Sequence, residues 1–357
     1  SYAGAGGSGV VLVRYLGGSA STGGTVNAGT GSATGYTLQT FNSSDTLAFN
    51  TLAATFSGVI DGPGSFVADP SARGKFTFTA NNSYAGSTTL SAGTLQVGTG
   101  GTTGSIGTGT ITNHGTLIYQ HSDTVSVADV VGGTGVLKQM GTGTLNLSSI
   151  NSYTGGTLVN AGTLALNNDL NLGAVPASVD PSNVQVNGGT LRFYPGFTTL
   201  HANRGMVLGA SNATLSTDNT ATVAYAGAIT GAGSLTKTGS GVLSLSGANT
   251  FSGGTTVSAG QLIAGGSANA LGTGSVAVSG TRLSLNTSSP VTYENAIQLT
   301  GAGVLENIGN QRVIFNKGID TNRLDTVVVD GGTAGLTIAD IATPTGAGAS
   351  YFIKGQV

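Results

Sequence analysis

Short segments of this chain alternate apolar and polar residues with a period of two. In 144–148 (TLNLS) and 242–246 (VLSLS), the leucines share one side and small polar residues occupy the other, as in a strand with one buried face. Between such segments lie Gly-Gly, Gly-Thr-Gly and Asn-Ala-Gly, where glycine supplies the positive φ of tight corners. The pattern therefore predicts many short β-strands joined by corners rather than by long loops.

A block of fourteen residues occurs three times, at 82–95 (NSYAGSTTLSAGTL), 151–164 (NSYTGGTLVNAGTL) and 249–262 (NTFSGGTTVSAGQL). Each copy begins with asparagine, places an aromatic residue two positions later, and carries a glycine near its end. We assign a structural role in the repeat to these nine residues: Asn82, Asn151, Asn249, Tyr84, Tyr153, Phe251, Gly93, Gly162 and Gly260. The repeats extend over about 62–117, 132–191 and 230–283, and a partial copy starts at 301.

The repeats predict an all-β fold in which short parallel strands stack as the coils of a β-solenoid. No single repeat is long enough to enclose a core, and stacking the repeats would bury a continuous one. We place the solenoid at 21–357, after a glycine-rich N-terminal segment, 1–20, that contains one strand. A series of antiparallel sandwiches is the competing all-β interpretation.

The composition narrows the classes of partner. Only 7% of the 357 residues are charged and the net charge is −2, so the chain lacks the basic surface that nucleic-acid binding requires. The longest aliphatic run, Val10 to Val13, is far shorter than the ~20 residues of a membrane-spanning helix. We expect no nucleic-acid partner and no transmembrane segment.

Candidate chemistry is sparse. Aspartates are scattered singly along the sequence, whereas glycoside cleavage needs a pair of nearby carboxylates. His114, His121 and His201 have no metal-site spacing, and we expect them at the surface. We interpret Tyr84, Tyr153 and Phe251 as a structural stack inside or on the coils rather than as a platform for sugars. The chain is therefore not expected to be an enzyme, to bind a metal or to use a cofactor.

Residues 231–262 follow the pattern GxGxLxKxGxGxLxLxGxNxYxGxTxxxAGxL almost throughout. The second copy departs from it, with Gln139 at the usual lysine position and Ser149 in place of a glycine. This pattern resembles the autotransporter-associated β-strand repeat in passenger regions of Gram-negative surface proteins. The resemblance implies a right-handed β-helix exported to the cell surface or the extracellular space, with a role in adhesion or scaffolding and no particular ligand.

We expect a non-catalytic extracellular structural protein, a rod-like cell-surface or fibre-forming subunit. Val10, Val11, Leu12, Val13 and Tyr15 form the strand that would join a neighbouring copy by strand addition, which would give a head-to-tail polymer. Alternatively, the chain is a piece of a longer passenger. Two other functions remain open: an adhesin or carbohydrate-binding passenger domain that contacts extracellular polysaccharide or the surface of a host or neighbouring cell, and a polysaccharide-degrading β-helix.

Overall fold

The computed structural model describes residues 53–68, 74–301, 303–317 and 319–320, together with the backbone of eight strands within 10–49 and 327–354. The described residues form β-strands and one short 3-10 helix, η1 (Asp169–Leu172), without any α-helix. None of them belongs to a helix that is long and apolar enough to cross a membrane. The chain divides into two compact units, one made of 1–157 and 172–174 and the other of 158–171 and 175–357.

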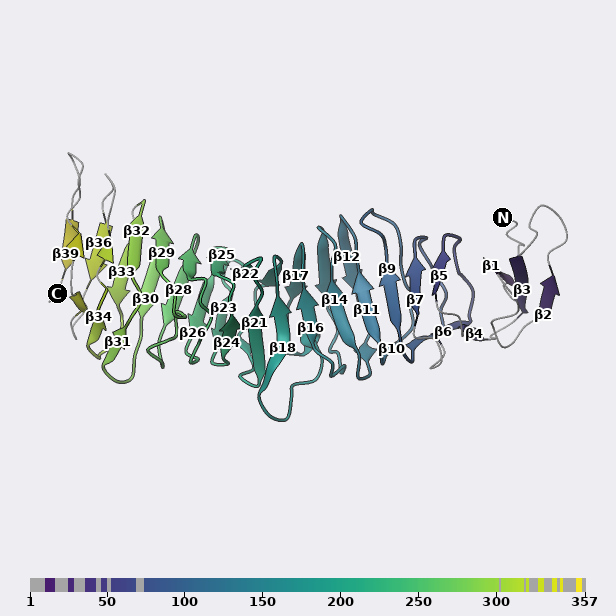
Figure 1. Cartoon of the computed structure of the whole chain (residues 1–357), viewed down its shortest axis with the longest axis horizontal. Helices are drawn as coiled ribbons and strands as arrows, with labels where there is room; N and C mark the ends of the chain where they lie inside the picture. The colour runs from purple at the N-terminus through teal and green to yellow at the C-terminus, as the bar shows by residue number, and fades with distance from the viewer. Residues whose placement is uncertain are drawn as a thin grey trace. The chain divides into compact units, whose positions relative to one another are not determined.

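In the first unit, parallel strands from successive coils lie side by side (Figure 1). One sheet contains β4 (Thr46–Phe49), β6 (Ser65–Ala68), β8 (Thr88–Leu90), β10 (Ile111–Asn113) and β13 (Val131–Gly132). A second contains β5 (Ala53–Phe56), β7 (Lys75–Phe78), β9 (Thr94–Val97), β11 (Thr116–Tyr119) and β14 (Val136–Gln139). On a third face, β12 (Thr124–Val127) pairs with β15 (Thr144–Leu147). The last strand that begins in this unit is β16 (Thr157–Val159).

The second unit also consists of stacked parallel strands. One series runs through β17 (Thr163–Leu166), β19 (Thr190–Phe193), β22 (Ala213–Thr217), β25 (Leu235–Thr238), β27 (Thr255–Val257), β29 (Val276–Ser279), β32 (Ile297–Thr300), β35 (Ile319–Asp320) and β38 (Ile341–Ala342). Another contains β20 (Thr199–Leu200), β23 (Thr222–Tyr225), β26 (Val242–Leu245), β28 (Gln261–Ala264), β30 (Arg282–Leu285), β33 (Val304–Asn307), β36 (Val327–Asp330) and β39 (Tyr351–Lys354). Two shorter series are β18 (Asp180–Val186), β21 (Arg204–Leu208) and β24 (Ile229–Gly231), and β31 (Val291–Tyr293), β34 (Val313–Phe315) and β37 (Leu336–Ile338).

Register places like residues above one another in the core. Along β26, β28, β30 and β33, Leu243 pairs with Leu262, Leu262 with Leu283, and Leu283 with Leu305, and all four are at most 1% exposed. The period-two pattern is the reason, because alternate side chains of a strand point to opposite faces. The arrangement confirms the predicted all-β fold of stacked parallel coils, and the sandwich interpretation fails for these strands.

The N-terminal strands are arranged differently. An antiparallel sheet is formed by β1 (Val10–Leu16), β2 (Thr25–Ala28) and β3 (Tyr36–Asn42), and its strand order is β1-β3-β2. The first strand of the parallel stack is β4, so the strands at 25–42 belong to this sheet, although the expected solenoid boundary lay at residue 21.

Candidate functional site

The repeat asparagines lie inside the coils and bridge neighbouring ones. Asn249 is fully buried; its Oδ1 accepts from the Ile229 N–H of the preceding coil at 2.8 Å, and its Nδ2 donates to the Ala270 carbonyl of the next at 2.7 Å. Asn82 makes the same pair of bonds, from the Ile60 N–H at 2.8 Å and to the Ser105 carbonyl at 2.7 Å.

The third repeat asparagine, Asn151, is also buried and accepts from the Val131 N–H at 2.9 Å. Each of these side chains satisfies backbone groups that the corner would otherwise leave without a partner in the interior. Each of the three asparagines therefore accepts a backbone N–H from the preceding coil.

The repeat aromatics are buried as well, at most 1% exposed. The hydroxyl groups of Tyr84 and Tyr153 lie 2.6 Å from those of Thr88 and Thr157, respectively. Burial raises the pKa of Tyr84 to about 12, which keeps its hydroxyl neutral. The rings do not form the expected stack, because the copies are 69 and 98 residues apart whereas adjacent coils are offset by about 20 residues, as Thr124 and Thr144 are. Each ring fills its own coil and is unavailable as a sugar platform.

The repeat glycines occupy corners that need left-handed backbone. Gly93, Gly162 and Gly260 have φ values of 77°, 55° and 67°, which side chains with a Cβ rarely adopt. At Gly260 a Cβ would also lie 2.3 Å from the Gly241 carbonyl oxygen of the coil below. Backbone conformation and close coil spacing both require glycine there.

The lysine position of the repeat pattern holds an internal donor. Lys237 is fully buried, and its Nζ donates at 2.7, 2.9 and 3.1 Å to the carbonyls of Thr238, Gly239 and Ala259. In the second copy Gln139 performs the same task, with Nε2 donating at 3.0 and 3.1 Å to the carbonyls of Gly141 and Gly143. The departure from the pattern therefore preserves the contact. Burial lowers the pKa of Lys237 to about 8.

A buried ion pair in the second unit escaped sequence reasoning. Arg204 is fully buried, donates from Nε to the two carboxylate oxygens of Asp169 at 3.0 and 3.1 Å, and donates from a terminal nitrogen to Asn183 Oδ1 at 3.0 Å. Arg204 and Asp169 are 35 residues apart, and no repeated motif marks either of them.

Of the three histidines expected at the surface, His121 is buried, whereas His114 and His201 are exposed. His121 is 4% exposed, because its ring packs against Gly98, where a Cβ would lie 2.6 Å from Nε2. Its Nδ1 lies 3.2 Å from Asp123 Oδ1. His114 and His201 are hydrogen-bonded at exposed positions. Within the described part of the chain, no three His, Cys, Asp or Glu residues come together in a group that could hold a metal ion.

The strand predicted for assembly is paired within its own chain. From Val10 to Leu16, β1 pairs in antiparallel register with β3, so that Val11 lies opposite Phe41 and Tyr15 opposite Thr37. In the order β1-β3-β2, strand β1 is at one edge of this sheet. Strand addition by Val10, Val11, Leu12, Val13 and Tyr15 stays a prediction, and it would use the other edge of β1.

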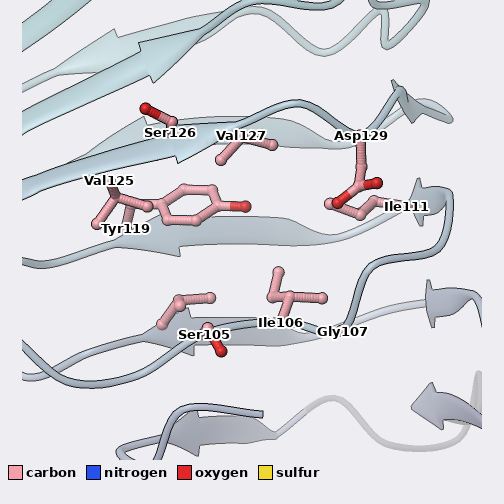
Figure 2. A pocket seen from close by; sticks show the side chains of 10 residues that line it. Ser105, Ile106, Gly107, Ile111, Tyr119, Val125, Ser126, Val127 and Asp129 are labelled. Atoms are coloured by element: carbon pink, nitrogen blue, oxygen red, sulfur yellow. The ribbon is translucent and has the colours of Figure 1, made fainter. Parts of the chain in front are cut away.

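A pocket of about 70 Å³ lies in the first unit beside β12 (Figure 2). On this face β12 is the first strand of its sheet, because the preceding coil passes through the glycine-rich segment 98–110 without a strand. The interior beneath β12 is therefore incompletely filled. The aliphatic part of the walls comes from Val97, Ile106, Ile111, Val125 and Val127, and the rest of the lining includes Ser105, Gly107 and Ser126.

Two polar groups point into this pocket. Figure 2 shows the Tyr119 hydroxyl and the Asp129 carboxylate facing each other across it, one at the end of β11 and the other in the turn after β12. Tyr119 is 3% exposed, and burial raises its pKa. Partial burial also raises the pKa of Asp129. No sequence pattern distinguishes Asp129 from the other scattered aspartates, because the residue that faces it across the pocket comes from another strand.

Segments of the chain are similar to sequences of known proteins. The model of the Passenger-associated-transport-repeat family matches residues 74–97, 137–166 and 235–264, and these ranges contain all three fourteen-residue blocks. The chain is 34% identical over 194 residues to the adhesin BmaC autotransporter of Brucella suis biovar 1 (strain 1330). This alignment covers 42% of the chain but 6% of that adhesin. No solved structure matches. The three segments are thus repeats of the autotransporter passenger type, as their sequence pattern indicated.

Proposed function

We propose that this chain is a non-catalytic, extracellular segment of an adhesin-like autotransporter passenger, and that it acts as a stacked-coil scaffold at the cell surface. The observation that carries the proposal is the coincidence of the family's repeats with stacked coils whose shared polar residues are used internally. Asn82, Asn249, Lys237 and Gln139 all direct their polar atoms to backbone groups of the coils. The recurring polar residues thus hold the backbone of each coil in the geometry that the stack requires.

The adhesive part of the proposal is supported by the relative, which is named an adhesin. Because the alignment covers so little of that protein, adhesion by this chain itself is a proposal. Its target would be extracellular polysaccharide or the surface of a host or neighbouring cell. A polysaccharide-degrading activity has less support, because the polar residues that recur in the repeats serve the fold.

Antibodies raised against the purified chain test the location. They should label intact cells of the source bacterium, and brief protease treatment of intact cells should remove the label. Labelling that requires permeabilised cells would refute an extracellular location. Release of reducing ends from a polysaccharide panel, above the level given by heat-treated protein, would contradict the non-catalytic role.

Adhesion is tested by attachment assays. Fab fragments against the chain should reduce attachment of the source cells, and a Fab against an unrelated surface protein is the control. An unchanged attachment would favour a purely structural role over an adhesive one.

Head-to-tail assembly is a separate part of the proposal. We propose that the outer edge of β1 accepts a strand from another copy, because an edge strand presents unpaired backbone groups. Electron microscopy of the purified chain should show fibres, and deletion of residues 1–15 should abolish them. Fibres that survive this deletion, or a wild-type chain that stays monomeric at all concentrations, would refute it.

A further inference from the structure

The pocket beside β12 contains two polar groups that the fold does not satisfy. Among the described residues, none hydrogen-bonds the Tyr119 hydroxyl or the Asp129 carboxylate, although the two point toward each other from opposite sides of the pocket (Figure 2). The hydroxyl groups of the repeat tyrosines Tyr84 and Tyr153, by contrast, each have a threonine partner at 2.6 Å. Both groups therefore have capacity for a ligand.

The size of the pocket limits that ligand. Its volume of about 70 Å³ is well below the ~150 Å³ of a cavity that accommodates benzene. A sugar ring would not enter it, whereas the end of an unbranched chain would. Five of the lining residues are aliphatic, and their side chains favour contact with methylene groups over contact with further polar groups.

The charge and the hydrogen-bonding groups of the pocket determine which class of ligand can bind. The Asp129 carboxylate repels anions and attracts cations, and it is the only acid among the residues that line the pocket. A bare Ca²⁺ ion would require six to eight oxygen ligands, which one carboxylate and one phenol do not supply. An ammonium group suits the site better, because it offers several N–H donors and both the carboxylate and the phenol oxygen can accept.

We propose that this pocket binds the end of a primary alkylammonium, with the ammonium between Asp129 and Tyr119 and its first methylenes against the aliphatic walls. The source is either a lysine side chain of a partner protein or a small free amine. The site lies within one unit of the chain, and it stands independently of the proposed passenger role. Its failure would leave that role intact.

Saturation-transfer NMR with the purified chain tests the site. Ethylammonium and Nα-acetyl-lysine methylamide are the probes, and tetraethylammonium, which is too bulky to enter, is the reference cation. Saturation should pass from the protein to the methylene protons of the ethylammonium. Comparable saturation of the side-chain end of the lysine derivative would identify protein lysines as ligands, and its absence would identify free amines.

Variants make the result specific. Asp129→Asn should weaken ethylammonium binding by about tenfold or more, the loss expected from one charge-assisted hydrogen bond, and Tyr119→Phe should weaken it less. Asp61→Asn, which removes the same charge at an exposed position, should bind as the wild type does. Unchanged thermal unfolding would show that the variants are folded. Binding that survives Asp129→Asn, an equal response to tetraethylammonium, or no response of the wild type to either amine would overturn the proposal.

Discussion

Substitution of Asn249 is the most direct test of how the coils are joined. In Asn249→Ala, the Ile229 N–H loses its acceptor at 2.8 Å and the Ala270 carbonyl loses its donor at 2.7 Å. Because the site is fully buried, water does not replace either partner. Each unsatisfied buried group costs about 1–3 kcal/mol, so we expect a loss of about 2–6 kcal/mol in the free energy of unfolding. That is a large share of the total stability of a typical domain, about 5–15 kcal/mol.

The variant Asn249→Asp adds a pH dependence to the same argument. A protonated carboxyl group can accept from Ile229 and donate to Ala270, as the amide does, whereas the carboxylate faces the Ala270 carbonyl with negative charge. Desolvation and this carbonyl should raise the pKa of the new carboxyl in the folded state above its unfolded value of about 3.9. The variant should then approach the wild type in stability below about pH 4, and lose stability as the pH rises through the folded-state pKa.

Urea unfolding followed by far-UV circular dichroism measures both effects, and amide hydrogen exchange at Ile229 gives a local readout. Asn269 provides the matched control, since it is exposed and its side chain makes no hydrogen bond among the described residues. Asn269→Ala and Asn269→Asp should change stability little. If the Asn249 variants lose no more stability than these controls, or if the deficit of Asn249→Asp does not shrink on acidification, the bridge does not join the coils as described.

Three further substitutions test the other internal contacts. Burial lowers the pKa of Lys237 to about 8, whereas an unfolded lysine keeps its proton to about pH 10. The free energy of unfolding of the wild type should therefore increase as the pH rises from about 8 to about 10. Urea titrations of Lys237→Met should show no such increase. Arg204→Met leaves the Asp169 carboxylate without its buried partner and should cost about 3–5 kcal/mol, whereas a cost below 1 kcal/mol would contradict the buried pair. Gly260→Ala places a Cβ 2.3 Å from a backbone carbonyl at positive φ, and its melting temperature should fall; an unchanged value would show that the corner adapts.

The structural residues of the repeats can be predicted from the sequence because each of them meets a requirement that recurs in every copy. Gly260 recurs where a corner needs positive φ, and Asn249 recurs where a coil presents the same backbone groups to its neighbours. The residues that were missed have no such periodicity. Tyr119 and Asp129 meet only because one coil crosses this face without a strand, and Arg204 finds Asp169 across 35 residues. His121 was misplaced at the surface because its burial depends on Gly98 of a neighbouring coil.

By itself, the sequence determined the class of fold: period-two alternation specifies strands with one buried face, and the recurring glycine corners specify short strands joined by tight turns. The pattern of residues 231–262 also carries the resemblance to passenger repeats. Only the tertiary structure decided which side chains meet across coils, how β1 is paired, and where the interior remains open. The physical reason is that strand formation depends on neighbouring residues, whereas register between coils depends on the length of every intervening corner, and a change of one residue in a corner moves a side chain to the opposite face.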